Sequence, residues 1–340
     1  MMAGAPTGRV AITGALSFTG RYLATHLLNS AKASSVLNLS SRKKPISSHN
    51  LSENHLDKIA SHELCFDDAL GLTKALGGVD VLYCTYWIRF ARDGDTHEKA
   101  ADRCRVLFEC AREAGVKKVV FSAHTGMSHE GFPYIDGKAR ACQHLRDLCA
   151  SSSMKYAIVK PCGIFGDVPN ESILFNNAAY VLRRTPLFIL PRDGLPKFQP
   201  IHVQDMAQLM AEIGSGSIDT SGEELDAVGS DSPTGLELFR CLRDACGGSA
   251  MLCSVVPSYL PSRFVGALTK PLDWMTGDVL LDSDDLDLMY SGLTVADDPT
   301  DPRIKGRRGV LQWMKEHGPN LGRKYVSSIA RYYYPRQQSQ

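Results

Sequence analysis

The chain has 340 residues, 44% of them hydrophobic and 22% charged, a balance typical of a folded globular protein and not of a disordered one. Lys and Arg number 38 against 37 Asp and Glu, and the formal net charge is +1. So small a charge provides no overall field for phosphate backbones, which argues against nucleic acid as a partner. The ten cysteines form no CxxC pair, so we expect no metal site.

The first predicted strand begins near Arg9, so we expect no signal peptide before it, and no apolar run approaches the length of a membrane span. We therefore expect a cytoplasmic protein without a transmembrane segment, and an organelle stays open.

The N-terminal half alternates short apolar runs with longer amphipathic stretches, which predicts βαβ units and a parallel sheet. The predicted strands cover residues 10–13, 36–39, 79–84, 119–122 and 156–159. The predicted helices between them cover 19–29, 96–114 and 134–149, and Gly115 is expected to cap the second of these helices. The expected fold class is α/β, with a doubly wound, mainly parallel sheet.

The pattern changes beyond Pro161, where prolines recur and helices predominate. Helices are predicted over 172–184, from an N-cap near Gln204 or Asp205, and over 234–246, 257–268, 283–290 and 321–333, with a strand over 225–228. We expect one domain over 8–165, to which 198–230 returns. A smaller, mostly helical region would comprise 166–197 and 231–335.

The segment that joins the first strand to the first helix is rich in small residues. Glycines in such a turn allow the backbone to approach a pyrophosphate, and the helix N-terminus supplies free N–H donors. Ser17 stands where a middle glycine is often found, and a purely structural turn is the alternative interpretation. The residues expected to contact a dinucleotide here are Thr13, Gly14, Ser17, Phe18, Thr19 and Gly20.

The second strand ends in Ser41, Arg42 and Lys43, where an NAD site would carry an acidic residue for the ribose hydroxyl. Arg42 could instead clamp a 2′-phosphate with help from its two neighbours. NADP(H) is therefore the preferred cofactor, NAD stays open, and a solvated basic loop is the alternative.

Tyr134 and Lys138 are spaced i,i+4 on a predicted helix, which places both side chains on one face. A lysine in this position can lower the pKa of the phenol, so that Tyr134 acts as a general acid or base. Tyr156 and Lys160 have the same spacing on a predicted strand, where four residues span about 13 Å, too far for the two groups to couple.

The order of these motifs resembles the extended and atypical short-chain dehydrogenase/reductase families. Further matching features are Asp67 after a third strand, Lys160-Pro161 after a later one, and the segment PIHVQD over 200–205. The resemblance covers nearly the whole chain. It is greatest to atypical members of the NAD-dependent epimerase/dehydratase group, which also contains the complex I 39 kDa accessory subunit.

This resemblance implies an NAD(P)-binding Rossmann domain and a substrate-binding region after Pro161. It implies that Asp67 contacts the adenine, that Thr85 and Tyr86 lie near the nicotinamide ribose, and that Lys160 and Pro161 position the nicotinamide end. Lys138 would also hold the ribose, and Tyr134 with Lys138 would form the catalytic pair.

The sequence departs from the family pattern where a Ser or Thr usually polarises the substrate oxygen, because His124 aligns there. His124 could donate the hydrogen bond, Thr125 or Ser122 could replace it, or the site binds cofactor without turnover. Trp87, just after the fourth strand, is a candidate for lining an apolar pocket or for the core.

The leading hypothesis is an NADP(H)-dependent oxidoreductase of a small or medium apolar carbonyl or alcohol. The alternatives are a non-catalytic NAD(P)H-binding accessory or sensor protein, and an epimerase or dehydratase that uses the bound cofactor. The expected partner is a small, apolar substrate, and a homodimer or a protein partner is left open.

Overall fold

The computed structural model describes residues 7–42, 44–45, 47–127, 131–190, 194–218, 220, 222–253, 278, 294–297, 301, 303 and 306–332. Lys43 and the helices predicted over 257–268 and 283–290 lie outside this described part. The chain divides into two compact units, Met1–Pro161 with Val203–Ala227, and Cys162–His202 with Val228–Gln340.

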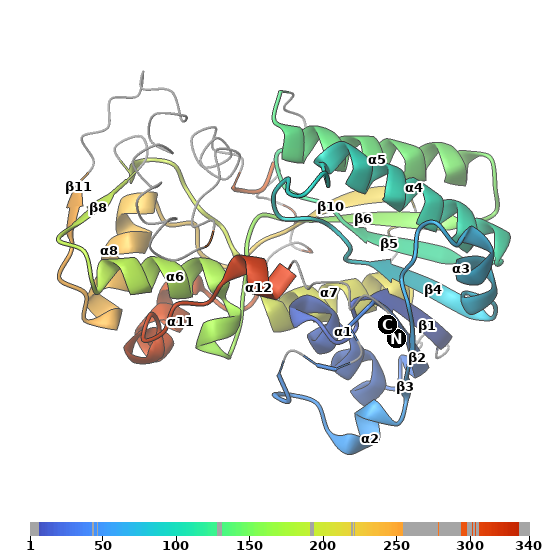
Figure 1. Ribbon diagram of the computed structural model, residues 1–340, viewed down its shortest axis with the longest axis horizontal. Helices are drawn as coiled ribbons and strands as arrows, with labels where there is room; N and C mark the ends of the chain where they lie inside the picture. The colour runs from blue at the N-terminus through green and yellow to red at the C-terminus, as the bar shows by residue number, and fades with distance from the viewer. Residues whose placement is uncertain are drawn as a thin grey trace. The chain divides into compact units, whose positions relative to one another are not determined.

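A seven-stranded parallel sheet forms the centre of the first unit (Figure 1), with the order β10-β6-β5-β4-β1-β2-β3. The strands are β1 (Thr7–Thr13), β2 (Ala33–Leu39), β3 (Ile59–His62), β4 (Val79–Cys84), β5 (Lys118–Ser122), β6 (Lys155–Pro161) and β10 (Glu223–Ala227). From β3 to β6 this is the order 3-2-1-4-5-6 of dinucleotide-binding sheets, and β10 extends it at one edge. The predicted α/β class with a doubly wound parallel sheet is confirmed.

Helices cover both faces of this sheet (Figure 1), α1 and α7 on one side and α3, α4 and α5 on the other. Their bounds are α1 (Phe18–Asn29), α3 (Ala69–Ala75), α4 (His97–Glu113), α5 (Pro133–Ala150) and α7 (Val203–Gly214), and the short α2 (Glu53–Leu56) precedes β3. Thr96 caps α4 by accepting the Lys99 N–H, and Gly115 follows with φ +79°, as the sequence predicts. The helix for which the sequence predicts an N-cap near Gln204 or Asp205 instead begins at Val203. It begins there because the short strand Ile201–His202 ends directly before it.

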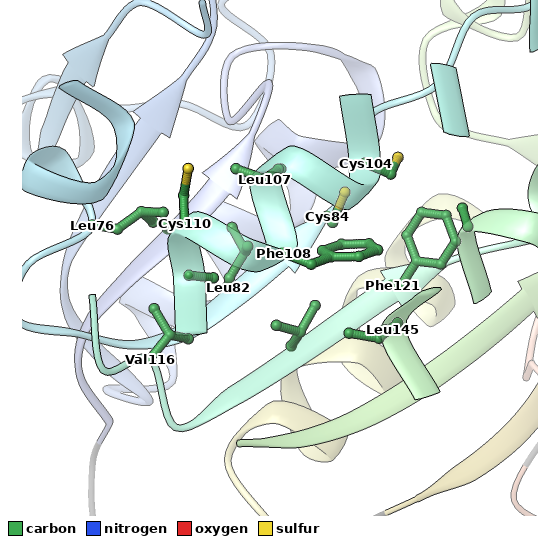
Figure 2. Close-up of a cluster of buried hydrophobic side chains, with 14 of the residues drawn as sticks. Leu76, Leu82, Cys84, Cys104, Leu107, Phe108, Cys110, Val116, Phe121 and Leu145 are labelled. Atoms are coloured by element: carbon green, nitrogen blue, oxygen red, sulfur yellow. The ribbon is translucent and has the colours of Figure 1, made fainter. Parts of the chain in front are cut away.

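Apolar side chains of α4 and α5 pack against β4 and β5 (Figure 2). Leu107 and Phe108 of α4 are fully buried, and the Phe108 ring meets Phe121 of β5 edge to face at 5.5 Å. Burying side chains of this size stabilises the fold by about 2 kcal/mol each. The core therefore fixes α4 and α5 above the strands whose ends carry the candidate site.

β1 and β4 are neighbours in the sheet, but the helices that follow them cover opposite faces. The crevice that such a divergence opens at the carboxyl ends of strands is where doubly wound folds bind ligands. The turn after β1 and the loop after β4 lie at this point.

The second unit contains short elements. They are β7 (Ile164–Phe165), η1 (Pro169–Glu171), α6 (Ile173–Leu182), β8 (Leu187–Ile189), β9 (Ile201–His202), α8 (Gly235–Cys246), β11 (Met251–Cys253), α11 (Val310–His317), η3 (Gly318–Asn320) and α12 (Ser328–Tyr332). β7 pairs with β9 and β8 with β11, in parallel. Thr234 and Glu237 form a capping box that starts α8 where the sequence predicts a helix.

The helix predicted over 321–333 is wrong for residues 321–327, since only Ser328–Tyr332 is helical. The Asn177 side chain, on α6, donates to the Val326 carbonyl and accepts from the Val326 N–H. Gly322 has φ +68°, outside the helical region. Long-range hydrogen bonds thus replace those of a helix.

α11 was missed by the sequence analysis. Its signal is the apolar spacing of Val310, Trp313 and Met314, which are buried on one face. Within the described residues, no helix is both long and apolar enough to cross a bilayer.

Candidate active site

The turn after β1 is built by two glycines. Gly14 has φ +70°, its N–H donates to the Leu39 carbonyl at the end of β2, and its own carbonyl accepts the Ser17 hydroxyl at 2.6 Å. A Cβ on Gly20 would lie 2.1 Å from the Gly14 carbonyl oxygen. Gly20 is therefore required for the close approach of α1 to the turn.

The N-terminus of α1 offers uncapped backbone donors. Ser17 is the N-cap residue, but its side chain makes no capping hydrogen bond, and no acidic residue lies in the first turn. Ser17, Phe18 and Thr19 are all partly exposed here. Backbone N–H groups and the positive end of a helix dipole attract anions, and the cradle above Gly20 fits the pyrophosphate of a dinucleotide.

The end of β2 carries no carboxylate in the segment 39–42. Ser41 is exposed, and the Arg42 backbone is held by bonds to the Ser40 and Asn38 side chains. These contacts fix the backbone from which the half-exposed Arg42 side chain extends. The Gly14 turn lies next to it, since the Gly14 N–H donates to the Leu39 carbonyl. Ser41 and Arg42 thus fit a 2′-phosphate, as expected for NADP(H).

Thr85 joins the carboxyl end of β4 to that of β1. Its N–H donates to Thr13 Oγ1 at 2.7 Å and its hydroxyl donates to the Thr13 carbonyl at 2.6 Å. These two residues of the expected cofactor site are thus in direct contact at the divergence of β1 and β4.

Tyr86 follows the carboxyl end of β4, and Asp67 follows the carboxyl end of β3, at the same edge of the parallel sheet. The Tyr86 ring contacts that of Phe66 at 4.8 Å, and its hydroxyl accepts from Arg103 at 3.3 Å. Burial raises the pKa of Tyr86 to about 12, against the opposing effect of Arg103. Asp67, next to Phe66, is exposed and available to a ligand.

Tyr134 and Lys138 lie on the first two turns of α5, as the sequence predicts. Lys138 is only 3% exposed, and its ammonium donates to the Ser122 carbonyl at the end of β5 at 2.6 Å. Burial lowers the pKa of Lys138 to about 8, although the neighbouring thiols act in the opposite direction. Burial thus brings the pKa of this lysine closer to neutrality than that of an exposed lysine.

Tyr134 is surrounded by three aromatic side chains. Its ring meets His97 at 5.3 Å, His124 at 5.5 Å and Trp87 at 6.1 Å, each nearly perpendicular. His97 and Trp87 were not assigned to the catalytic group from the sequence. Both come from segments that precede α5 by tens of residues, and their spacing gives no signal of this contact.

His124 is buried, and its Nδ1 donates to the Thr125 carbonyl at 2.7 Å. A neutral ring with this tautomer has an acceptor at Nε2 and becomes a second donor only when protonated. Thr125 is fully buried, and its N–H bonds to the Pro161 carbonyl. Thr125 thus ties the end of β5 to the end of β6.

Lys160 on β6 pairs with Asp226 of the neighbouring strand β10 at 3.2 Å, and both side chains are nearly buried. The sequence analysis predicted a strand here but did not identify Asp226 as a partner. Lys160 and Pro161 close the carboxyl end of β6, while Tyr156 lies at its beginning. The two tyrosine–lysine pairs therefore have different environments.

The structure links the expected residues into groups by direct contacts. Thr13 contacts Thr85, and Gly14 contacts Ser17. Trp87, two positions after Thr85, contacts both Tyr134 and Lys138. Asp67 follows Phe66, whose ring contacts Tyr86, and Lys160 pairs with Asp226.

A family model, described as the NAD dependent epimerase/dehydratase family, matches residues 10–215. Comparison with curated protein sequences finds no match.

Solved structures share the fold over most of the chain. An NADPH-dependent quinone oxidoreductase from Escherichia coli, complexed with NADPH, has a TM-score of 0.67 and 19% identity over 90% of this chain and 99% of its own. A Citrobacter sp. triphenylmethane reductase complexed with NADP(H) has a TM-score of 0.66 and 13% identity, over 91% of this chain and 99% of its own. A UDP-N-acetylglucosamine 4-epimerase from Methanobrevibacter ruminantium has a TM-score of 0.59 and 18% identity, over 74% of this chain and 87% of its own.

At these identities the neighbours establish the fold alone, whereas the family model spans more than half of the sequence. It confirms the resemblance found from the motifs. The chain belongs to the NAD dependent epimerase/dehydratase family.

Proposed function

We propose that this protein is an NADP(H)-dependent oxidoreductase of the short-chain dehydrogenase/reductase type that acts on a small or medium apolar carbonyl or alcohol. The observation that carries the proposal is the pairing of Tyr134 with Lys138 on one face of α5. Lys138 is buried one helical turn after Tyr134, and burial lowers its pKa to about 8. A perturbed pKa of this kind is typical of functional sites.

The cofactor assignment rests on the fit of the β1 turn. Gly14, Gly20 and the N-terminus of α1 would hold the pyrophosphate, and Ser41 and Arg42 the 2′-phosphate. Thr13 and Thr85 would shape the floor of the site. The bound nicotinamide supplies or accepts the hydride. Similar folds that bind NADPH and NADP(H) support this choice of cofactor.

In the reductive direction Tyr134 would donate its phenolic proton to the substrate oxygen. The Lys138 ammonium would then stabilise the phenolate that remains, and it would hold the ribose hydroxyls. We assign polarisation of the substrate oxygen to His124, whose ring lies against Tyr134 at 5.5 Å, with Thr125 and Ser122 as the alternatives. The segments 166–197 and 231–335 are the proposed substrate-binding region.

The test begins with protein stripped of nucleotide and titrated separately with NADPH and NADH, read by nicotinamide fluorescence and thermal shift. The NADPH-loaded protein is then given a panel of apolar aldehydes and ketones. The expected results are tighter binding of NADPH and stoichiometric oxidation of NADPH by at least one carbonyl.

Each alternative gives a different outcome. Binding without turnover of any carbonyl would indicate an accessory or sensor protein. Conversion of a substrate without net consumption of NADPH would indicate an epimerase or dehydratase. Either result contradicts the proposal.

A further inference from the structure

The ammonium group of Lys138 lies between two aromatic faces. Its Nζ atom is 4.2 Å from the centre of the Trp87 ring and 4.8 Å from that of Phe121. Nζ also donates a hydrogen bond to the Ser122 carbonyl, at 2.6 Å. A cation this close to a ring face is attracted by the ring quadrupole, most strongly when the ring is an indole.

Three thiols act on the charge of Lys138, namely Cys84 of β4, Cys104 of α4 and Cys142 of α5. The other titratable groups nearby are Tyr134, one turn earlier on α5, and the two histidines that contact its ring, His97 and His124. Cys84, Cys104 and Phe121 can be followed in Figure 2. Burial raises the pKa of Cys104 and of Cys142, that of the latter to about 12. Burial also acts upward on Cys84, but hydrogen bonds from Cys104 and the Tyr86 backbone outweigh it and lower the pKa.

No carboxylate is among the groups that act on Lys138 within the described residues. A buried ammonium without a carboxylate loses its hydration, which is unfavourable unless other groups replace water. The two ring faces and the Ser122 carbonyl are the groups that the structure places there.

The orientation of Trp87 is fixed by its own neighbours. Its ring lies nearly parallel to that of His97, at 10° and 6.2 Å, and meets Tyr134 edge to face at 6.1 Å. His97 is 3% exposed at the start of α4, and its backbone lies against Gly137 of α5, where a Cβ would come within 2.8 Å of the His97 carbonyl. The indole face is therefore presented to Lys138 by the packing of α4 on α5.

We propose that Trp87 is a positioning residue, whose indole face holds the Lys138 ammonium in its charged form beside Tyr134. An indole can do this without a negative charge. A carboxylate in its place would bind the ammonium in a salt bridge and compete with the phenolate of Tyr134. The relevance to catalysis rests on the proposed function, whereas the contact between Trp87 and Lys138 does not.

The first experiment is NMR titration of protein labelled with ¹³Cε-lysine, with the Lys138 signal assigned by its loss in Lys138→Met. Removing the π face destabilises the charged lysine, so Trp87→Leu lowers the midpoint from about 8 by about one pH unit. Trp87→Phe lowers it less, because a benzene ring keeps part of the quadrupole. Tyr156→Leu is the control, since Tyr156 is a half-buried aromatic residue at the far end of β6.

A second measurement leaves the shape of the side chain almost unchanged. The chain has only three tryptophans, so all of them can be replaced biosynthetically by mono-, di- and trifluorinated analogues. The Lys138 midpoint should fall progressively with fluorination in the wild-type sequence and stay constant in the Trp87→Phe background. An unchanged midpoint in the wild-type sequence would overturn the proposal, even if Trp87→Leu fails to fold.

Enzyme kinetics separates this inference from the proposed function. If both hold, the pH at which turnover declines on the alkaline side moves downward with the Lys138 midpoint. If the NMR shift is found but no substrate turns over, the positioning role stands and the proposed function fails. If turnover depends on Tyr134 but the Lys138 midpoint is unchanged in the Trp87 variants, the positioning role fails and the proposed function stands.

Discussion

Thr13 and Thr85 bind each other through two hydrogen bonds, at 2.7 and 2.6 Å, across the carboxyl ends of β1 and β4. The Thr85 hydroxyl is used in this contact, since it donates to the Thr13 carbonyl. The pair therefore fixes the loop that carries Tyr86 and Trp87 relative to the Gly14 turn. The proposed cofactor site and the proposed catalytic group thus share one rigid connection.

Replacing Tyr134 by Phe removes the proposed proton donor while keeping the ring that contacts His97, His124 and Trp87. Turnover should fall by about 10²–10⁴-fold, the usual contribution of general acid catalysis, and NADPH affinity should change little. The matched control is Tyr156→Phe, since Tyr156 also precedes a lysine by four residues but lies on β6. Equal turnover in Tyr134→Phe and wild type would remove Tyr134 from the mechanism.

Replacing Gly20 by Ala tests the turn after β1. The added Cβ would lie 2.1 Å from the Gly14 carbonyl oxygen, which is backbone and cannot rotate away. We expect destabilisation by about 1–3 kcal/mol and weaker NADPH binding, measured by urea unfolding and fluorescence titration. Gly163→Ala is the control, because its Cβ would meet only Pro200 Cβ at 3.5 Å. Wild-type stability and affinity in Gly20→Ala would show that the turn is not as tight as described.

Changing Arg42 to Glu should weaken NADPH binding by about 10- to 100-fold and NADH binding far less. The reason is that a charge-assisted bond to the 2′-phosphate is replaced by repulsion. Separate fluorescence titrations with the two cofactors measure the ratio. Lys44→Glu changes the charge of an exposed neighbour by the same amount and serves as the control. Equal losses for both cofactors would contradict the phosphate clamp.

The buried lysine should leave a signature in the pH dependence of stability. Burial lowers the pKa of Lys138 in the folded protein to about 8, from the ordinary lysine value of 10.5. Between these values the unfolded chain binds more protons, so the unfolding free energy should rise with pH, by about 3 kcal/mol in total. Urea unfolding at a series of pH values should show this rise in wild type and its loss in Lys138→Met. Exposed Lys155→Met should retain the rise.

Asn177 should determine the path of the chain before α12. Replacing Asn177 by Ala removes the pair of hydrogen bonds to Val326, of 2.9 and 3.1 Å, and should cost about 2–4 kcal/mol. Hydrogen exchange at the Val326 amide should accelerate accordingly. Exposed Asn320→Ala is the control. Unchanged exchange would mean that other contacts hold this segment.

Much of the sheet was predictable, because short apolar runs and amphipathic helices carry their periodicity locally. The strand over 79–84 and the start of α5 agree with the predictions closely. Local rules also found the Gly14 turn and the Gly115 cap, where a positive φ favours glycine. The predicted extent of the last helix was wrong because a contact distant in the sequence decides the path of residues 321–327. The side chain of Asn177 on α6 holds Val326 by two hydrogen bonds.

The sequence by itself determined most of the parallel strands of the first unit and the common face of Tyr134 and Lys138, since both follow from the repeat of the backbone. Only the tertiary structure decided what surrounds these two residues. Trp87 and His97 reach Tyr134 because α4 packs closely on α5, and Asp226 reaches Lys160 because β10 pairs with β6. Such contacts join segments distant in the chain, and no local pattern records them. The same packing removes water from Lys138, and this burial lowers its pKa.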